Sequence, residues 1–162
     1  MPAITRFVLI PKSAINDLRA AAVPTKTSWL GRSVDAFPDF LRRRGREVAT
    51  YRWSSWVMST LLEYLNEKQS IDLTASSYDD LSDHLSKARG SAHFILTSEH
   101  RRDYLDKLDA GAFTEDELRD YYNEFSSVTE KDAGRPMSDG ITTLHEALAH
   151  VDDKTIVILE IG

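Results

Sequence analysis

ITRFVLIPKSAINDLRAAA, residues 4–22, is the stretch that decides the fold class. Its first part, Ile4–Ile10, is largely β-branched or aromatic, and Pro11 ends the strand because proline has no N–H for a ladder. Ser13 is placed to cap a helix whose apolar residues share one face and which ends before Pro24. A strand followed directly by an amphipathic helix predicts a fold that combines the two types of element.

The longest amphipathic pattern of the chain lies further on, in Arg52–Lys68. Its apolar side chains recur three and four residues apart: Trp53, Trp56, Val57, Met58, Leu61, Leu62 and Leu65. Such a wide stripe predicts a central, buried helix. Full burial of a large apolar side chain contributes about 1.5–3 kcal/mol. We therefore expect this helix, with both tryptophans inward, to contribute most to the core.

Two more segments have the composition of strands. Ala92–Thr97 is short and nearly all apolar between Gly90 and Ser98, and Thr155–Gly162 is rich in isoleucine and valine at the C-terminus. A terminal strand this apolar would aggregate on an open edge, so we expect it inside the sheet or under helices.

Helix signals fill most of the remaining chain. Thr114 and Glu117 form a capping-box pattern, whereas the polar stretch around Gly134–Pro136 predicts an exposed loop. Lys26–Arg46 predicts only a short helix. The sequence thus predicts a helix-rich α+β single domain over residues 1–162. Its small mixed sheet, with strands near residues 3–10, 92–97 and 155–161, would be covered by amphipathic helices.

The totals fit an ordinary globular protein. The 162 residues are 41% hydrophobic and 28% charged, and the chain has no cysteine, which excludes disulfides, thiolate zinc sites and thiol nucleophiles. The apolar run near the N-terminus is too short for a signal peptide. No apolar stretch reaches the roughly 18 residues of a membrane span. We expect a cytoplasmic protein without a membrane partner.

Charge is distributed unevenly along the chain. Residues 1–52 hold ten Lys/Arg and four Asp/Glu, a balance of +6, and residues 53–162 hold ten and twenty-two, a balance of −12, which together give the net charge of −6. Such an asymmetry indicates either complementarity between packed elements or steering of a charged partner.

No motif indicates a metal or a cofactor. In His145–His150 the two histidines are five residues apart, which places them about 140° apart around a helix, so they cannot both face one zinc ion. Asp106–Glu117 resembles a calcium loop at its first, sixth and last positions, but Leu108 and Ala110 replace two oxygen ligands. Nucleotide-binding glycine loops and the G-x-S-x-G turn of many hydrolases are also absent from the sequence.

Two charged segments are candidates for partner binding. The basic one consists of Arg42, Arg43, Arg44 and Arg46, which would suit phosphates or an acidic protein surface. Because the whole chain is acidic, we do not expect nucleic-acid binding. The acidic candidate is the predicted helix that carries Glu115, Asp116, Asp120 and Glu124.

One catalytic alternative remains open. His93 lies in a predicted strand, and Arg101 and Tyr104 follow the end of that strand at Thr97, a place where clefts form in many folds. These three residues would serve a small hydrolase or transferase. A hydrogen-bonded core histidine is the competing interpretation of His93.

The order of the segments Ile4–Ala22, Trp53–Leu65, Phe94–Leu105 and Ile156–Gly162 resembles the YfbM-like family of small bacterial domains of unknown function. The resemblance covers most of the chain but not Lys26–Arg46. It implies a fold and carries over no catalytic residue. Small acidic bacterial domains of this kind are often accessory proteins, including immunity proteins that neutralise toxins by binding them.

We therefore expect a non-enzymatic domain that binds a protein partner, such as a basic protein, through its acidic surface, as an immunity or accessory protein does. The alternatives are the hydrolase or transferase at the end of strand 92–97, and phosphate or nucleic-acid binding through Arg42–Arg46.

Overall fold

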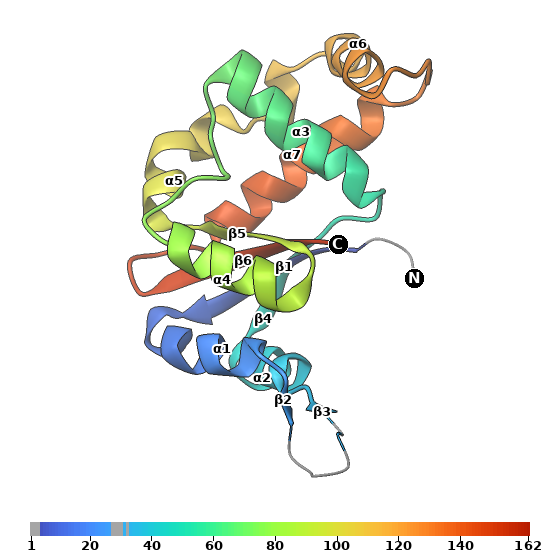
Figure 1. Ribbon diagram of the computed structural model, residues 1–162. Helices are drawn as coiled ribbons and strands as arrows, with labels where there is room; N and C mark the ends of the chain where they lie inside the picture. Colours follow the sequence, from blue (N-terminus) through green and yellow to red (C-terminus); the bar gives the residue numbers. More distant parts are fainter. Residues whose placement is uncertain (1–3, 27–30, 32) are drawn as a thin grey trace.

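The computed structural model describes residues 4–26, 31 and 33–162, in which a four-stranded sheet lies between two groups of helices (Figure 1). The strands are β1 (Thr5–Pro11), β2 (Thr25–Lys26), β3 (Ser33–Val34), β4 (Arg46–Thr50), β5 (Ala92–Leu96) and β6 (Thr155–Ile161). The α-helices are α1 (Ile15–Ala22), α2 (Phe37–Arg44), α3 (Ser55–Gln69), α4 (Asp79–Arg89), α5 (Ser98–Tyr104), α6 (Glu115–Ser126) and α7 (Gly134–Ala149). Three 3-10 turns are η1 (Lys12–Ala14), η2 (Leu105–Lys107) and η3 (Ala110–Ala112).

The main sheet has the strand order β4-β1-β6-β5 and is antiparallel throughout. The predicted α+β fold class and the interior position of the C-terminal strand are confirmed, since β6 pairs along its length with both β1 and β5. The prediction of a mixed sheet is wrong because β6 runs against both of its neighbours. The edge strand β4 was not predicted, because only Val48 and Ala49 of its five residues are buried.

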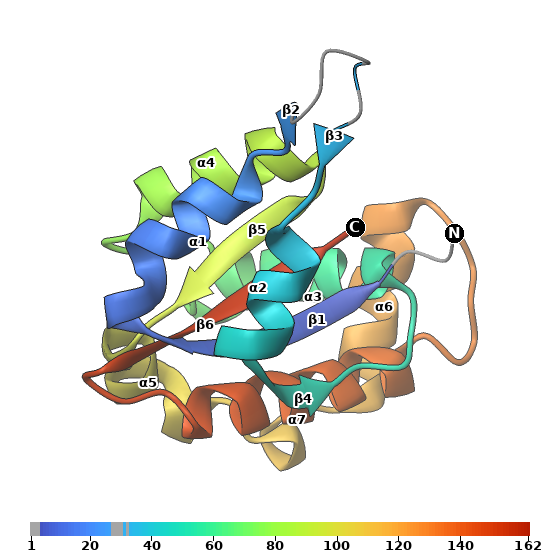
Figure 2. The same ribbon diagram turned by 90° about the horizontal axis from the view of Figure 1, so that it is seen from below.

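Alternation along the strands divides the core into two clusters, one on each face of the sheet. Val8, Ile10, Ile156 and Ile158 face α1, α2 and α4, whereas their neighbours Phe7, Val157 and Leu159 face α3, α6 and α7. Figure 2 shows α1, α2 and α4 on one side of the sheet and α3, α6 and α7 on the other. The structure therefore has three layers, and α3 and α6 belong to the outer part of one helical layer.

Local signals in the sequence are confirmed only in part. Ser13 lies inside η1 and does not cap α1. Thr114 accepts a hydrogen bond from the Glu117 N–H (3.2 Å), as the capping-box pattern predicts, but the Glu117 carboxylate accepts one from Tyr64 instead. Gly134–Pro136 forms the first turn of α7 rather than a loop. Proline fits there because the N–H groups of a first helical turn have no acceptor within the helix, so the N–H that proline lacks is not missed.

The weakly predicted stretch Lys26–Arg46 contains α2, which confirms the short helix, together with β3. At the start of this stretch Thr25–Lys26 pairs with Ser33–Val34 in a small hairpin, and residues 27–30 and 32 lie outside the described residues. Over the described ranges, no helix combines the length and the apolar composition needed to cross a bilayer.

Candidate functional site

A row of aromatic rings runs along the seam between α3 and α6, which pack antiparallel. Trp56, near the start of α3, lies 6.2 Å from Phe125, near the end of α6, measured between ring centroids. Phe125 stacks on Tyr121 at 5.9 Å, and Tyr121 meets Tyr64 edge-on at 5.0 Å. Tyr121 and Phe125 are one helical turn apart, so both project toward α3.

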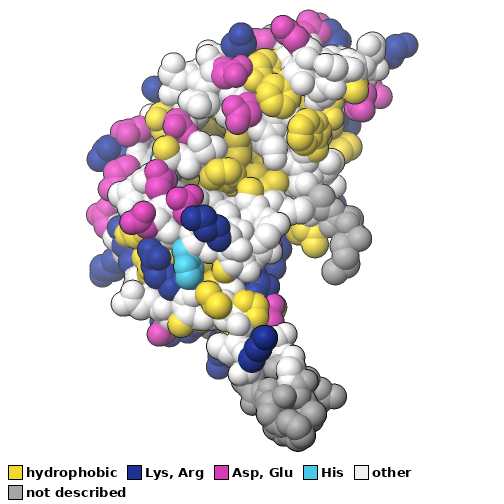
Figure 3. Space-filling view, in the orientation of Figure 1, with side chains coloured by type: hydrophobic (Ala, Val, Ile, Leu, Met, Phe, Trp, Pro, Cys, Tyr) yellow, Lys and Arg dark blue, Asp and Glu magenta, His cyan; other side chains and the backbone are white. Residues whose placement is uncertain are grey.

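Part of this row is open to solvent. Trp56 is 52% exposed and Phe125 is 43% exposed, and Trp53 and Val128 nearby are exposed to a similar extent. The expectation that Trp53 and Trp56 both lie in the core is wrong. Each indole N–H is held at the surface by a polar partner, because Trp56 donates to the Ser126 hydroxyl (3.1 Å) and Trp53 donates to the Asp139 carboxylate (2.9 Å). Figure 3 shows hydrophobic side chains gathered over α3 and α6 with acidic side chains around them.

The same two helices carry a strong negative charge. α3 and α6 contain seven Asp/Glu and two Lys/Arg, a balance of −5. Among the ion pairs of the described residues, none involves Glu63, Glu67 or Glu124. Burial, a hydrogen bond to Glu67 and the charges of Glu67, Glu63 and Glu124 together raise the pKa of Tyr121. We call the aromatic residues Trp56, Tyr121 and Phe125 and the exposed Val128, with the carboxylates Glu63, Glu67 and Glu124, the α3–α6 surface.

The four acidic residues predicted to bind a partner all lie on α6, but they differ in their surroundings. Arg119 bonds to Asp116 (2.9 Å) and to Asp120 (2.8 Å), so its single positive charge offsets these two carboxylates in part. Glu124 belongs to the α3–α6 surface. Glu115 lines a separate cavity beside the start of α7.

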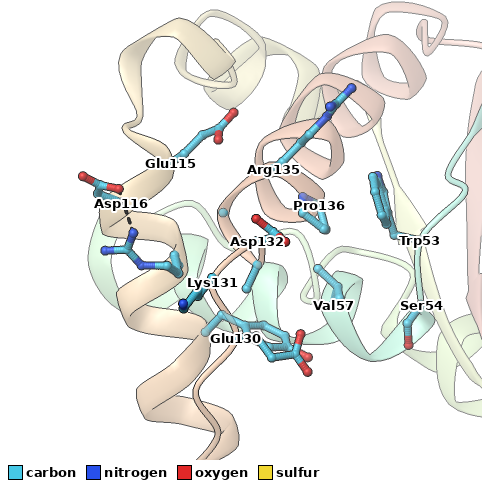
Figure 4. A pocket seen from close by; sticks show the side chains of 14 residues that line it. Trp53, Ser54, Val57, Glu115, Asp116, Glu130, Lys131, Asp132, Arg135 and Pro136 are labelled. Atoms are coloured by element: carbon cyan, nitrogen blue, oxygen red, sulfur yellow. Dashed lines mark hydrogen bonds and ion pairs between the residues drawn. The ribbon is translucent and has the colours of Figure 1, made fainter.

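That cavity, of about 680 Å³, lies between α6, the segment 130–133 and the first turns of α3 and α7. Figure 4 shows Glu115 and Asp116 on one side of it and Trp53 and Ser54 on the other. Its wall carries four carboxylates and three cations, so its charges largely cancel. α7 approaches α6 closely here, since a Cβ on Gly134 would lie 2.2 Å from the Glu115 carbonyl oxygen.

The predicted basic residues are at the other end of the molecule, on and after α2 (Figure 1). Arg42 pairs with Asp39, Arg43 donates to the Asp39 carbonyl oxygen, and Arg44 lies 3.8 Å from Asp17. Arg46 opens β4. The nearby carboxylates of Asp39 and Asp17 therefore offset part of this positive charge. None of the described ion pairs joins these arginines to the acidic residues of α6.

The three residues of the catalytic alternative have different neighbours. His93 is buried, donates from Nδ1 to the Ser91 carbonyl oxygen (2.9 Å) and meets the Phe37 ring edge-on. Arg101 donates to the Val151 carbonyl oxygen (2.6 Å). Tyr104 stacks on His100, and no cavity described here is lined by more than one of the three.

His100 was not singled out from the sequence, although it lies at the end of β5. Its Nδ1 accepts from the Thr97 N–H (3.2 Å) and its Nε2 lies 2.7 Å from the Ala75 carbonyl oxygen, to which it donates. Burial lowers the pKa of His100, which fits a neutral ring with both nitrogens occupied. This histidine fastens the loop before α4 to the start of α5. It takes the third helical position of a capping box that begins at Thr97, where Glu or Gln is the usual sequence signal.

The described residues contain no group of three or more potential metal ligands of the His, Asp or Glu type. His145 lies on the exposed face of α7, and His150 follows its last turn.

Comparisons of the chain with protein-family models, with curated proteins and with solved structures gave no match. The resemblance to the YfbM-like family therefore stays a prediction, and the geometry of the α3–α6 surface is the basis for a proposal about function.

Proposed function

We propose that this protein is a non-enzymatic binding domain that docks a basic protein partner on the α3–α6 surface. The observation that carries the proposal is the coincidence of exposed aromatic rings with carboxylates that have no ion-pair partner among the described residues. Aromatic side chains are enriched at the centres of protein interfaces, where they supply most of the binding energy.

The exposed rings are also held in place before a partner arrives. Trp56 is fixed by the hydrogen bond to Ser126, and Phe125 is stacked on Tyr121. A partner would therefore lose little side-chain entropy on ordering this surface, which favours tight binding. The bordering carboxylates would steer a basic partner and raise its association rate.

An immunity or accessory protein acts in this manner, since it regulates or neutralises its partner by covering it. Arg119 already offsets part of the charge of Asp116 and Asp120, which favours a docking centre nearer Glu67 and Glu124. We propose no catalytic or nucleic-acid function, because His93, Arg101 and Tyr104 have separate neighbours and the arginines of α2 have local acidic partners.

The experiment is capture of proteins from the source cells on the immobilised chain at low salt, followed by binding measurements with the purified partner. We expect Trp56→Ser combined with Phe125→Ser to weaken binding by at least about a hundredfold, since truncation of one hot-spot residue costs about 2 kcal/mol or more and the effects of two neighbours do not add in full. Asp83→Asn combined with Asp153→Asn, two exposed acids elsewhere, is the control and should bind as the wild type does. Higher salt should slow association.

Circular dichroism would verify that each variant is folded. Two results would each contradict the proposal: no protein captured at low salt, or a partner whose affinity is the same for the wild type and the aromatic double variant.

A further inference from the structure

A small notch opens at the far end of the α3–α6 surface, where α3 ends beside the middle of α6. Its volume is about 280 Å³, and its lining consists of Glu67, Lys68, Tyr121, Glu124 and Phe125. Cavities that take a small-molecule ligand measure about 300–1,000 Å³. The notch lies at the lower limit of that range, so it has room for a group of about the size of one side chain.

Two aromatic rings form one wall. Tyr121 and Phe125 stack with an angle of 16° between their planes, so their faces form a nearly continuous apolar platform. The face of an aromatic ring carries partial negative charge and attracts a cation placed over it.

Carboxylates complete the notch. The Tyr121 hydroxyl donates to Oε2 of Glu67 (2.9 Å), which fixes this carboxylate beside the rings. Oε1 of Glu67 has no hydrogen-bond donor among the described residues, and Glu124 adds a second carboxylate from α6. The raised pKa of Tyr121, which these carboxylates help to cause, agrees with a negative potential at this place.

The chain does not fill this notch with its own cation. Lys68 lines it, but within the described residues its ammonium group forms no ion pair with Glu67 or Glu124 and does not lie over either ring. Two carboxylates beside an aromatic platform therefore remain uncompensated at a position that a partner can reach.

From this geometry we infer that the notch receives the guanidinium group of an arginine from the protein partner. The inference rests on the proposed docking function and deepens it by naming the recognised group. A guanidinium is planar and weakly hydrated, so it can stack on the rings while its N–H groups donate to carboxylates at its edge. A lysine ammonium is a point charge with a stronger hydration shell and gains less from a flat wall.

The test uses the isotope-labelled full chain and a probe that is independent of the partner. N-acetyl-arginine-N-methylamide is titrated at low salt while the aromatic resonances are followed by NMR. We expect shifts centred on Tyr121 and Phe125. The matching citrulline compound, which has a similar shape without charge, should bind about tenfold more weakly, and the lysine compound should also bind more weakly than arginine.

Variants locate the site. Glu67→Gln combined with Glu124→Gln should reduce the arginine affinity about tenfold, whereas the control variant Asp83→Asn with Asp153→Asn, which removes the same charge elsewhere, should not. Phe125→Leu keeps an apolar side chain but removes one ring face, and it should reduce the affinity by roughly threefold.

Equal binding of arginine and citrulline, equal binding of arginine and lysine, or shifts confined to the cavity near Glu115 would overturn the inference. None of these outcomes depends on the partner. If the notch fails this test while Trp56→Ser with Phe125→Ser still abolishes partner binding, the docking function stands. If the notch binds arginine but those substitutions do not affect the partner, the docking function fails.

Discussion

Removal of residues 155–162 should leave the protein without a folded state, because β6 is the strand on which both halves of the core depend. Five of its side chains, Ile156, Val157, Ile158, Leu159 and Ile161, are between 0% and 7% exposed. At about 1.5–3 kcal/mol for each buried side chain, their loss amounts to about 8–15 kcal/mol. A domain of this size has a total stability of only about 5–15 kcal/mol.

The truncation also removes hydrogen bonds that no other strand can replace. β5 pairs only with β6 within the described sheet, and β1 keeps only its irregular pairing with β4. Far-ultraviolet circular dichroism, thermal melting and size-exclusion chromatography of the truncated chain are the measurements. A truncated monomer that still melts cooperatively would refute this reasoning.

Single substitutions give a graded version of the same test. Ile158→Ala creates a cavity on the face covered by α1, α2 and α4, and Leu159→Ala creates one on the face covered by α3, α6 and α7. Each should lower the free energy of unfolding by about 2–5 kcal/mol. Lys154→Ala, at an exposed position just before β6, is the control and should change it little.

Three further outcomes are expected. Gly134→Ala should destabilise the protein by about 1–3 kcal/mol in urea unfolding, because its Cβ would collide with the Glu115 backbone, whereas alanine usually stabilises a helix. Burial lowers the pKa of His93, so below its ordinary pKa of 6.5 the unfolded chain binds a proton that the folded chain does not. The contribution of neutral His93 to stability is therefore complete above that pH and is lost as the pH drops through the folded-state pKa. His93→Asn keeps a donor for the Ser91 carbonyl oxygen, and in urea unfolding it should make the free energy of unfolding fall less steeply with decreasing pH. Arg119→Gln should free two aspartates of α6, speed association with a basic partner in stopped-flow measurements and leave the melting temperature nearly unchanged.

Strands of the fold could be predicted where they are apolar on both faces. β1, β5 and β6 lie between two helical layers, so their composition distinguishes them from the rest of the chain. β4 lies at the edge and buries only Val48 and Ala49, which leaves no alternation long enough to recognise. The antiparallel arrangement could not be predicted either, because it depends on where β6 enters between strands that are distant in sequence.

The site was harder to predict than the fold, because an apolar stripe does not show which of its members lie at its border. Trp53 and Trp56 have the helical spacing of core residues, yet α7 and α6 cover only the neighbouring face of α3, formed by Met58, Leu61 and Leu65. An indole at the edge of the stripe can reach a polar partner with its N–H, as Trp56 does with Ser126. The notch combines residues that are distant in sequence, such as Glu67 and Tyr121, which are 54 positions apart. A local sequence pattern cannot indicate that such a pair is in contact.

The charge distribution favours the same α3–α6 surface as the exposed aromatic rings, and it is an independent observation. The positive balance of residues 1–52 is partly cancelled where it arises, since Asp39 and Asp17 pair with arginines of α2. Among the described ion pairs, those of Arg119 offset part of the negative balance of α3 and α6, and Glu67 and Glu124 take part in none. α2 and α6 lie at opposite ends of the molecule (Figure 1), so the field would orient an approaching basic protein toward the α6 end. Under the proposed docking function, long-range attraction and short-range apolar contact would favour the same face, and a partner steered by the first would meet the second without a search across the surface.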